Sequence, residues 1–152
     1  MVSLARDLQS CHLNVISNAN PEEMEKLYFL IRFKNDSDAC DVLLCAADRK
    51  DPLAAAYIGR LYQMGCQLLR KDQDKAVAYA NIAMPWLQSE ADKGNQYAQF
   101  HLGDCYLDGR GVERDEERAA RYFELGANQG HSSTQNSLGT TLFTNKPCLF
   151  KN

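Results

Sequence analysis

The sequence predicts an all-α protein built from repeated helix hairpins, and three observations support this fold class. Alanine is abundant and β-branched residues are sparse among the 152 residues. Apolar side chains recur at the spacing of one helix face along most of the chain. One segment can also be laid over its neighbour at a nearly constant offset, which is typical of stacked repeats.

The repeat is clearest between residues 54–94 and residues 98–130. The matching pairs are Ala54/Ala98, Gly59/Gly103, Tyr62/Tyr106 and Gly65/Gly109 at an offset of 44, Asp72/Asp115, Ala76/Ala119 and Tyr79/Tyr122 at 43, and Ala91/Ala127 and Gly94/Gly130 at 36. The offset shortens because the earlier unit holds seven more residues after its last tyrosine. Seven residues make about two helical turns, so the apolar stripe keeps its facing.

Each unit has the pattern of two helices joined by a glycine turn. Gly103 falls in the middle of a first helix, where glycine costs about 1 kcal/mol relative to alanine. We therefore expect the second helix to cross close to it. Gly109 is expected to end the first helix in the left-handed conformation, and Asp115 is expected to cap the second helix.

The combined pattern resembles a known repeat family. It runs A-x(3)-L-G-x(2)-Y-x(2)-G-x-G-V-x(2)-D-x(3)-A-x(2)-Y, ends in A-x(2)-G, and is similar to the Sel-one-like repeat, a relative of the tetratricopeptide repeat. Residues 98–130 match nearly every position. In residues 54–94, Cys66, Gln67 and Leu68 replace G-x-G-V and predict a different turn. The resemblance implies a right-handed α-solenoid of stacked antiparallel helix hairpins that binds proteins and has no chemistry of its own.

The chain is expected to form a single repeat domain over residues 1–152. Its parts are an N-terminal capping helix at 1–17, a degenerate repeat at 20–50, repeats at 52–94 and 96–130, and a partial repeat with a tail at 132–152. Leu4, Leu8, Cys11 and Val15 give the first helix an apolar stripe. Solenoids generally need atypical ends of this kind to close their cores.

Pro85 interrupts the expected second helix of the repeat at 52–94. It must kink that helix or start a new one. Trp86 follows it and has two interpretations. It either adds core beneath a long helix or faces a partner, since tryptophan is a common interface anchor.

The last expected repeat has a first helix and no second one. Leu138, Leu142 and Phe143 would then be only half covered. Either the tail folds back over them, or a partner or a second copy covers this end, or the chain is a truncated piece of a longer repeat protein. Self-association through the C-terminal end is therefore one expected outcome.

Charge and composition argue against several function classes. The net charge is −3 and the isoelectric point is near 5.6, which argues against a nucleic-acid partner. No apolar run approaches the ~20 residues that a membrane helix requires, and the N-terminus lacks the pattern of a signal peptide. The six cysteines do not follow the repeat, whereas some Sel-one-like proteins carry a regular disulfide. We therefore expect reduced thiols and a cytoplasmic protein.

Motifs that carry chemistry are missing from the sequence. It has no H-E-x-x-H, no C-x-x-C pair, no G-x-S-x-G and no phosphate-binding loop. Cys40 and Cys45 lie five residues apart on one expected helix, which is not a zinc pattern, and the three histidines are scattered. We expect no catalytic, cofactor-binding or metal-binding residues, no cofactor and no enzymatic activity.

The leading hypothesis is a non-catalytic scaffold or adaptor that binds a peptide or helix of a partner protein on the inner face of the solenoid. By resemblance to tetratricopeptide geometry, the partner-facing side chains lie beside the glycine and tyrosine positions of the first helices. They are Arg60, Gln63, Phe100, Asp104, Leu107, Asn136 and Thr140. The alternative hypothesis is a regulatory or targeting module of a larger enzyme such as a kinase.

Overall fold

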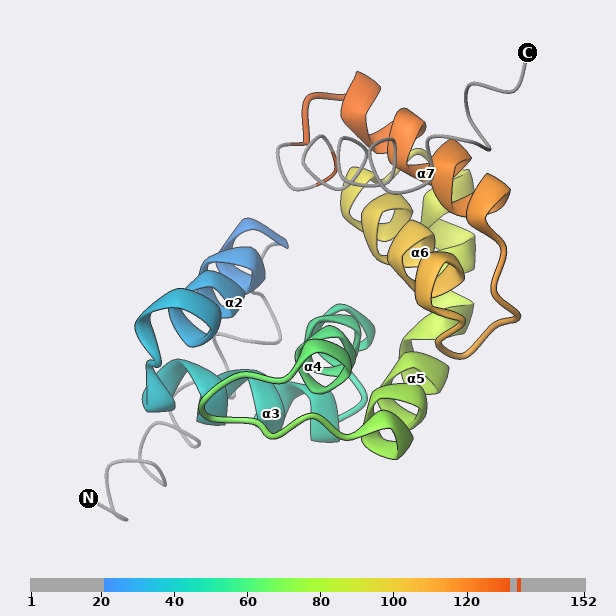
Figure 1. Cartoon of the computed structure of the whole chain (residues 1–152). Coiled ribbons are helices and arrows are strands. Elements are labelled where there is room, and N and C mark those ends of the chain that lie inside the picture. The colour runs from blue at the N-terminus through green and yellow to red at the C-terminus, as the bar shows by residue number, and fades with distance from the viewer. Residues whose placement is uncertain (1–20, 132–133, 135–152) are drawn as a thin grey trace. The chain divides into compact units, whose positions relative to one another are not determined.

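A computed structural model describes residues 21–131 and residue 134 (Figure 1). The expected capping helix at 1–17, most of the partial repeat at 132–152, and the candidate residues Asn136 and Thr140 lie outside the described residues. Within the described part the chain forms six helices and no strand. They are α2 (Pro21–Lys34), α3 (Ser37–Asp48), α4 (Pro52–Met64), α5 (Gln73–Asp92), α6 (Gln96–Asp108) and α7 (Glu116–Asn128). The all-α class and the helix-hairpin repeat predicted from the sequence are confirmed.

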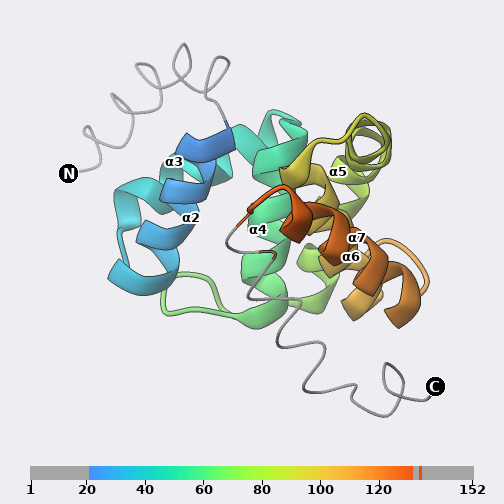
Figure 2. The same cartoon turned by 90° about the horizontal axis from the view of Figure 1, so that it is seen from above.

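The chain divides into two compact units, Met1–Met84 and Pro85–Asn152. In the first unit α2, α3 and α4 lie side by side and contact one another pairwise, as both views show (Figures 1 and 2). Their shared core is apolar. Its almost fully buried members include Ile31, Leu43, Ala47, Tyr57, Ile58 and Leu61. In the second unit α7 runs along α6.

Short polar side chains begin the helices at repeated positions. Asp51 and Asn95, 44 residues apart, cap α4 and α6 by accepting hydrogen bonds from Ala54 N and Ala98 N at 3.0 and 3.3 Å. Asp115 accepts from Arg118 N at 3.1 Å, so the predicted cap of the second helix is confirmed. Capping of this kind is worth about 1 kcal/mol for each helix.

The predicted close crossing at Gly103 is confirmed. A Cβ atom added there would lie 2.8 Å from Phe123 Cε1 and 3.2 Å from the carbonyl oxygen of Ala119, both on α7. Gly59, at the matching position of α4, would place its Cβ 3.2 Å from the carbonyl oxygen of Ala76 on α5. The second helix thus approaches the glycine of the first helix in each hairpin, most closely at Gly103.

The two hairpin turns differ as the sequence predicts. Gly109 ends α6 in the left-handed conformation, with φ 68° and ψ 38°. Gly65 also has a positive φ of 75°, but its ψ is 146°, so the chain leaves α4 in another direction. Both turns nevertheless end with the same bond: Asp72 N donates to Tyr62 O at 3.0 Å, and Asp115 N donates to Tyr106 O at 2.9 Å.

Pro85 does not start a new helix. The helix α5 is continuous from Gln73 to Asp92 with Pro85 inside it. After the proline, Leu87 is fully buried and Trp86 is half-buried. The seven-residue insert therefore adds to the core through Leu87.

The cysteines of the described part are free thiols, as predicted. They are Cys40, Cys45, Cys66 and Cys105. Burial, with the negative charge of Asp41 adding to it, raises the pKa of the Cys40 thiol to about 11. Burial also raises the pKa of the Cys105 thiol. Both thiols stay protonated at neutral pH and are poor nucleophiles.

Reduction is expected to leave the stability of the protein unchanged. With free thiols there is no covalent constraint on the unfolded chain for a reductant to remove. Calorimetric melting with and without a phosphine reductant, on freshly purified protein, tests this. A melting temperature that falls on reduction would show that a disulfide is present and contradict the prediction.

Candidate protein-binding surface

Two of the predicted partner-facing residues lie where α4 meets α2. Arg60 is half-buried, and its Nε donates to the hydroxyl of Tyr28 on α2 at 3.0 Å. From α2, Arg32 Nη1 donates to the carbonyl oxygen of Gly65 at 3.1 Å. These two bonds run in opposite directions between the helices. They tie α2 to the C-terminal half of α4 through two half-buried arginines.

The remaining members of this surface are Gln63 and Met64. Met64 is 38% exposed, which is high for a large apolar side chain next to a packed hairpin. Gln63 is half-buried, and its Oε1 accepts no hydrogen bond from the described residues. We name this surface the α2–α4 face. Its members are Tyr28, Arg32, Arg60, Gln63 and Met64.

The α2–α4 face combines positive charge with an apolar edge. Arg32 is bound to a neutral carbonyl oxygen and makes no ion pair within residues 21–131. Its guanidinium therefore retains donors for a carboxylate, the group that arginine binds most strongly. The arrangement fits an extended or helical segment with acidic and apolar side chains.

Two other predicted partner-facing residues are internal, and the expectation for them is corrected. Phe100 is 3% exposed, and its ring centroid lies 6.2 Å from that of Phe123 and 5.5 Å from that of His131. Asp104 is 7% exposed. Leu107, the third predicted residue of α6, is half-buried and stays a candidate. The tetratricopeptide analogy misplaces Phe100 and Asp104 because this unit uses that face of α6 for its own core.

A buried ion pair explains the position of Asp104. Arg110, in the Gly-Arg-Gly turn after α6, is 1% exposed, and its Nη2 lies 2.8 Å from Asp104 Oδ2. Asp108 lies 3.6 Å from its Nη1. Burial alone lowers the pKa of Arg110, but Asp104, Cys105 and Asp108 together outweigh it, so the pKa is raised above its ordinary value. Helical spacing could not reveal this pair, since the chain leaves the helix between its two members.

Each hairpin also carries a stacked tyrosine pair at matching positions. The ring centroids of Tyr62 and Tyr79 are 5.9 Å apart with planes 7° apart, and those of Tyr106 and Tyr122 are 5.9 Å apart with planes 4° apart. Asp72 and Asp115 cap the second helices of the two hairpins. In each hairpin the basic side chain three residues after this aspartate lies over the ring of the first tyrosine. These are Lys75, 5.3 Å from the Tyr62 ring, and Arg118, 5.6 Å from the Tyr106 ring.

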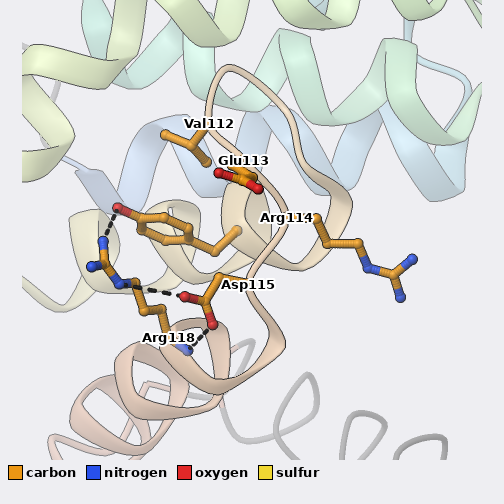
Figure 3. Close-up of a pocket in the computed structure, with 6 residues that line it drawn as sticks. Val112, Glu113, Arg114, Asp115 and Arg118 are labelled. Carbon is orange, nitrogen blue, oxygen red and sulfur yellow. Dashed lines mark hydrogen bonds and ion pairs between the residues drawn. The ribbon is translucent and has the colours of Figure 1, made fainter.

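A hollow of about 450 Å³ lies beside the second tyrosine pair (Figure 3). Its lining residues are Tyr106, Val112, Glu113, Arg114, Asp115 and Arg118. Arg118 donates to the hydroxyl of Tyr106 at 3.4 Å and lies 3.5 Å from Asp115 Oδ2, and Arg114 pairs with Glu116. Two acidic and two basic side chains line the hollow, so it has no excess of either charge. Among the described residues no three His, Cys, Asp or Glu side chains gather as a metal site.

The two hairpins share a glycine crossing, a capped second helix and a stacked tyrosine pair at matching positions. These shared features define a helix-hairpin repeat protein. The particular family follows from comparison with known sequences. The Sel1 repeat model matches residues 52–83 and 96–131, so the chain contains two Sel1 repeats. Sel1 repeats generally mediate protein–protein interaction. No helix in the described part of the chain is long and apolar enough to cross a bilayer.

The chain is similar to two mammalian proteins. It is 34% identical over 102 residues to "DAP3-binding cell death enhancer 1" of Rattus norvegicus and 42% identical over 102 residues to the protein of that name in Mus musculus. Each match spans 67% of this chain and 18% of the relative's length.

Two solved structures also resemble it. A Sel1 repeat protein from Oxalobacter formigenes is 25% identical, with a TM-score of 0.45 over 89% of this chain and 98% of that one. The protective antigen c5321 of uropathogenic Escherichia coli, which has an SLR fold, is 22% identical, with a TM-score of 0.42 over 84% of this chain and 34% of that one.

Proposed function

We propose that this chain is a non-catalytic adaptor module that binds a peptide or helix of another protein through the α2–α4 face. The observation that carries the proposal is the pair of arginines held across α2 and α4 by a tyrosine hydroxyl and a backbone carbonyl. Side chains fixed in this way lose little conformational entropy on binding, which favours affinity. Met64 supplies an apolar contact next to them.

The partner proposed first is DAP3. The rat and mouse relatives are named for binding DAP3, and their similarity to this chain extends over 102 residues. The chemistry of the α2–α4 face predicts that the bound segment carries at least one carboxylate. We further propose that the protein works in the cytoplasm.

Binding is tested with purified DAP3 and the full chain by titration calorimetry. The Arg32→Gln variant keeps a donor for the carbonyl oxygen of Gly65 but removes the positive charge. We expect it, combined with Gln63→Ala, to weaken binding about tenfold or more, since a charge-assisted hydrogen bond and a peptide contact are lost. Raising the salt concentration should weaken the wild-type complex and affect the double variant less.

Arg114→Gln on the second unit is the matched control. Arg114 is exposed and lies outside the α2–α4 face, so binding should be unchanged. Equal affinity of the double variant and the wild type would refute the α2–α4 face as the binding surface. Absence of any wild-type binding would refute DAP3 as the partner.

A further inference from the structure

The outer side of α2 is apolar, and the other described helices leave it exposed. Phe29 is 42% exposed, Leu30 39% and Phe33 66%. The rings of Phe29 and Phe33 stack one helical turn apart, with centroids 5.7 Å apart. Large apolar side chains gathered on one side of a helix are typical of an interaction site. We name these three side chains the α2 ridge.

Aromatic contacts join the α2 ridge to the α2–α4 face. The ring of Phe29 meets that of Tyr28, a member of the α2–α4 face, edge to face with centroids 5.6 Å apart. Tyr28 in turn packs against Tyr57 of α4 at 5.3 Å, and the guanidinium of Arg60 lies 5.8 Å from the Tyr28 ring. The α2 ridge therefore continues the α2–α4 face around α2.

The chemistry of the α2 ridge decides between an extended segment and a helix as its occupant. The three side chains are hydrocarbon, so they offer an incoming chain no hydrogen-bond donor or acceptor. An extended segment laid on them would bury backbone N–H and C=O groups without partners, which is costly. A helix satisfies its own backbone groups and presents only side chains. The ridge therefore favours a helix, which packs apolar side chains at i, i+3 or i+4, and i+7.

The charge along α2 favours one direction for that helix. Glu22 and Glu23 lie in the first turn of α2, and Arg32 and Lys34 lie in its last turn. Lys26 lies between the two ends, so it does not distinguish the two directions. Helices favour acidic side chains in their own first turn and basic ones in their last. An antiparallel helix therefore brings opposite charges together at both ends of α2, whereas a parallel one brings like charges together.

We propose that the α2 ridge binds an amphipathic helix of the partner protein, antiparallel to α2, with an acidic first turn and a basic last turn. The apolar stripe of this helix contacts Phe29 and Phe33, and its acidic turn lies beside Arg32 and Lys34. The inference rests on the proposed function, because it extends the α2–α4 face and places the carboxylate expected at Arg32 in a helix.

Fluorescence anisotropy of a designed helical peptide with the full chain tests the inference. The probe is a labelled peptide of about 18 residues, long enough to form a helix, with leucines on one face, glutamates in its first turn and lysines in its last. It should bind saturably, and Phe29→Ser with Phe33→Ser should weaken binding about tenfold or more. Both side chains are exposed, so the variant should keep its circular dichroism spectrum. Leu125→Ser on α7, where Leu125 is 49% exposed, is the matched control and should bind as the wild type does.

Two further peptides test the helix and its direction. A peptide of the same composition with a central proline cannot form a continuous helix and should bind about tenfold more weakly. A peptide with its glutamates and lysines exchanged should bind less well than the probe. The double variant Glu22→Lys with Lys34→Glu should shift this preference toward the exchanged peptide. Equal binding of the proline peptide, a preference that the double variant leaves unchanged, or no saturable binding of the probe up to about 1 mM would each overturn the inference.

DAP3 separates this inference from the proposed function. If Arg32→Gln with Gln63→Ala weakens DAP3 binding and Phe29→Ser with Phe33→Ser does not, the proposed function holds and the inference fails. If DAP3 does not bind but the helical probe binds through Phe29 and Phe33, the proposed partner fails and the inference holds. Sedimentation of the chain alone is the last check, because a dimer that Phe33→Ser abolishes would show a second copy on the α2 ridge and overturn the inference.

Discussion

Replacing Gly103 with valine is expected to lower the free energy of unfolding by about 3 kcal/mol. The added Cβ would lie 2.8 Å from the ring of Phe123, which is fully buried and cannot swing outward. The carbonyl oxygen of Ala119 would lie 3.2 Å away, so a shift of the helix itself is also opposed. Valine adds two methyl groups to this contact. Chemical denaturation followed by circular dichroism measures the loss.

The first hairpin provides a graded control for the crossing. At Gly59 the nearest atom to an added Cβ is a carbonyl oxygen at 3.2 Å, and Tyr79 Cβ is 3.5 Å away. Alanine regains about 1 kcal/mol of helix propensity at both positions. Gly59→Ala should therefore cost less than Gly103→Ala, because the nearest atom is 3.2 Å from the added Cβ at Gly59 and 2.8 Å from it at Gly103. A stability unchanged by Gly103→Val, or a larger loss for Gly59→Ala, would contradict the close crossing of α6 and α7.

Removing the carboxylate of Asp104 is expected to cost about 3 kcal/mol. In Asp104→Ala, Arg110 keeps its charge, since a guanidinium is not deprotonated in proteins, and it stays inside the fold with its nearest partner gone. Asp108, 3.6 Å away, offsets a part of this cost. The measurement is again the unfolding free energy, taken near neutral pH.

Two comparisons separate the buried charge from a simple loss of packing. The double variant Asp104→Leu with Arg110→Met removes both charges at similar volume, and it should recover most of the stability lost by Asp104→Ala. Glu116→Ala breaks the exposed pair with Arg114 and should cost well under 1 kcal/mol. If Asp104→Ala were no more harmful than Glu116→Ala, the buried pair would not contribute to stability.

Repetition made much of the fold predictable from the sequence. A glycine in the middle of a helix is unfavourable on its own, so its recurrence at Gly59 and Gly103 indicates a crossing that needs it. Aspartates that recur just before the second helices indicate caps, as Asp115 shows. These inferences hold because each depends on local chemistry that is present twice.

The candidate surface was predicted less well, because it depends on packing between helices that do not share the signature. Tyr28 and Arg32 were missed because α2 lacks the Leu-Gly-x-x-Tyr pattern and could not be aligned. Phe100 and Asp104 were placed outward by analogy with other repeat proteins. The ion pair that keeps Asp104 inside forms only after the chain turns at Gly109, and no periodicity in the sequence encodes that turn-dependent contact.

Hydrogen exchange of the full chain with and without bound DAP3 tests the central claim most directly. The account predicts slower exchange of the backbone amides in the second half of α2 and in α4 around Arg60 and Gln63. Amides of α7 should exchange at the same rate in both states. Protection confined to α7 and the Tyr106 hollow, with α2 and α4 unchanged, would contradict the proposal that the α2–α4 face binds the partner.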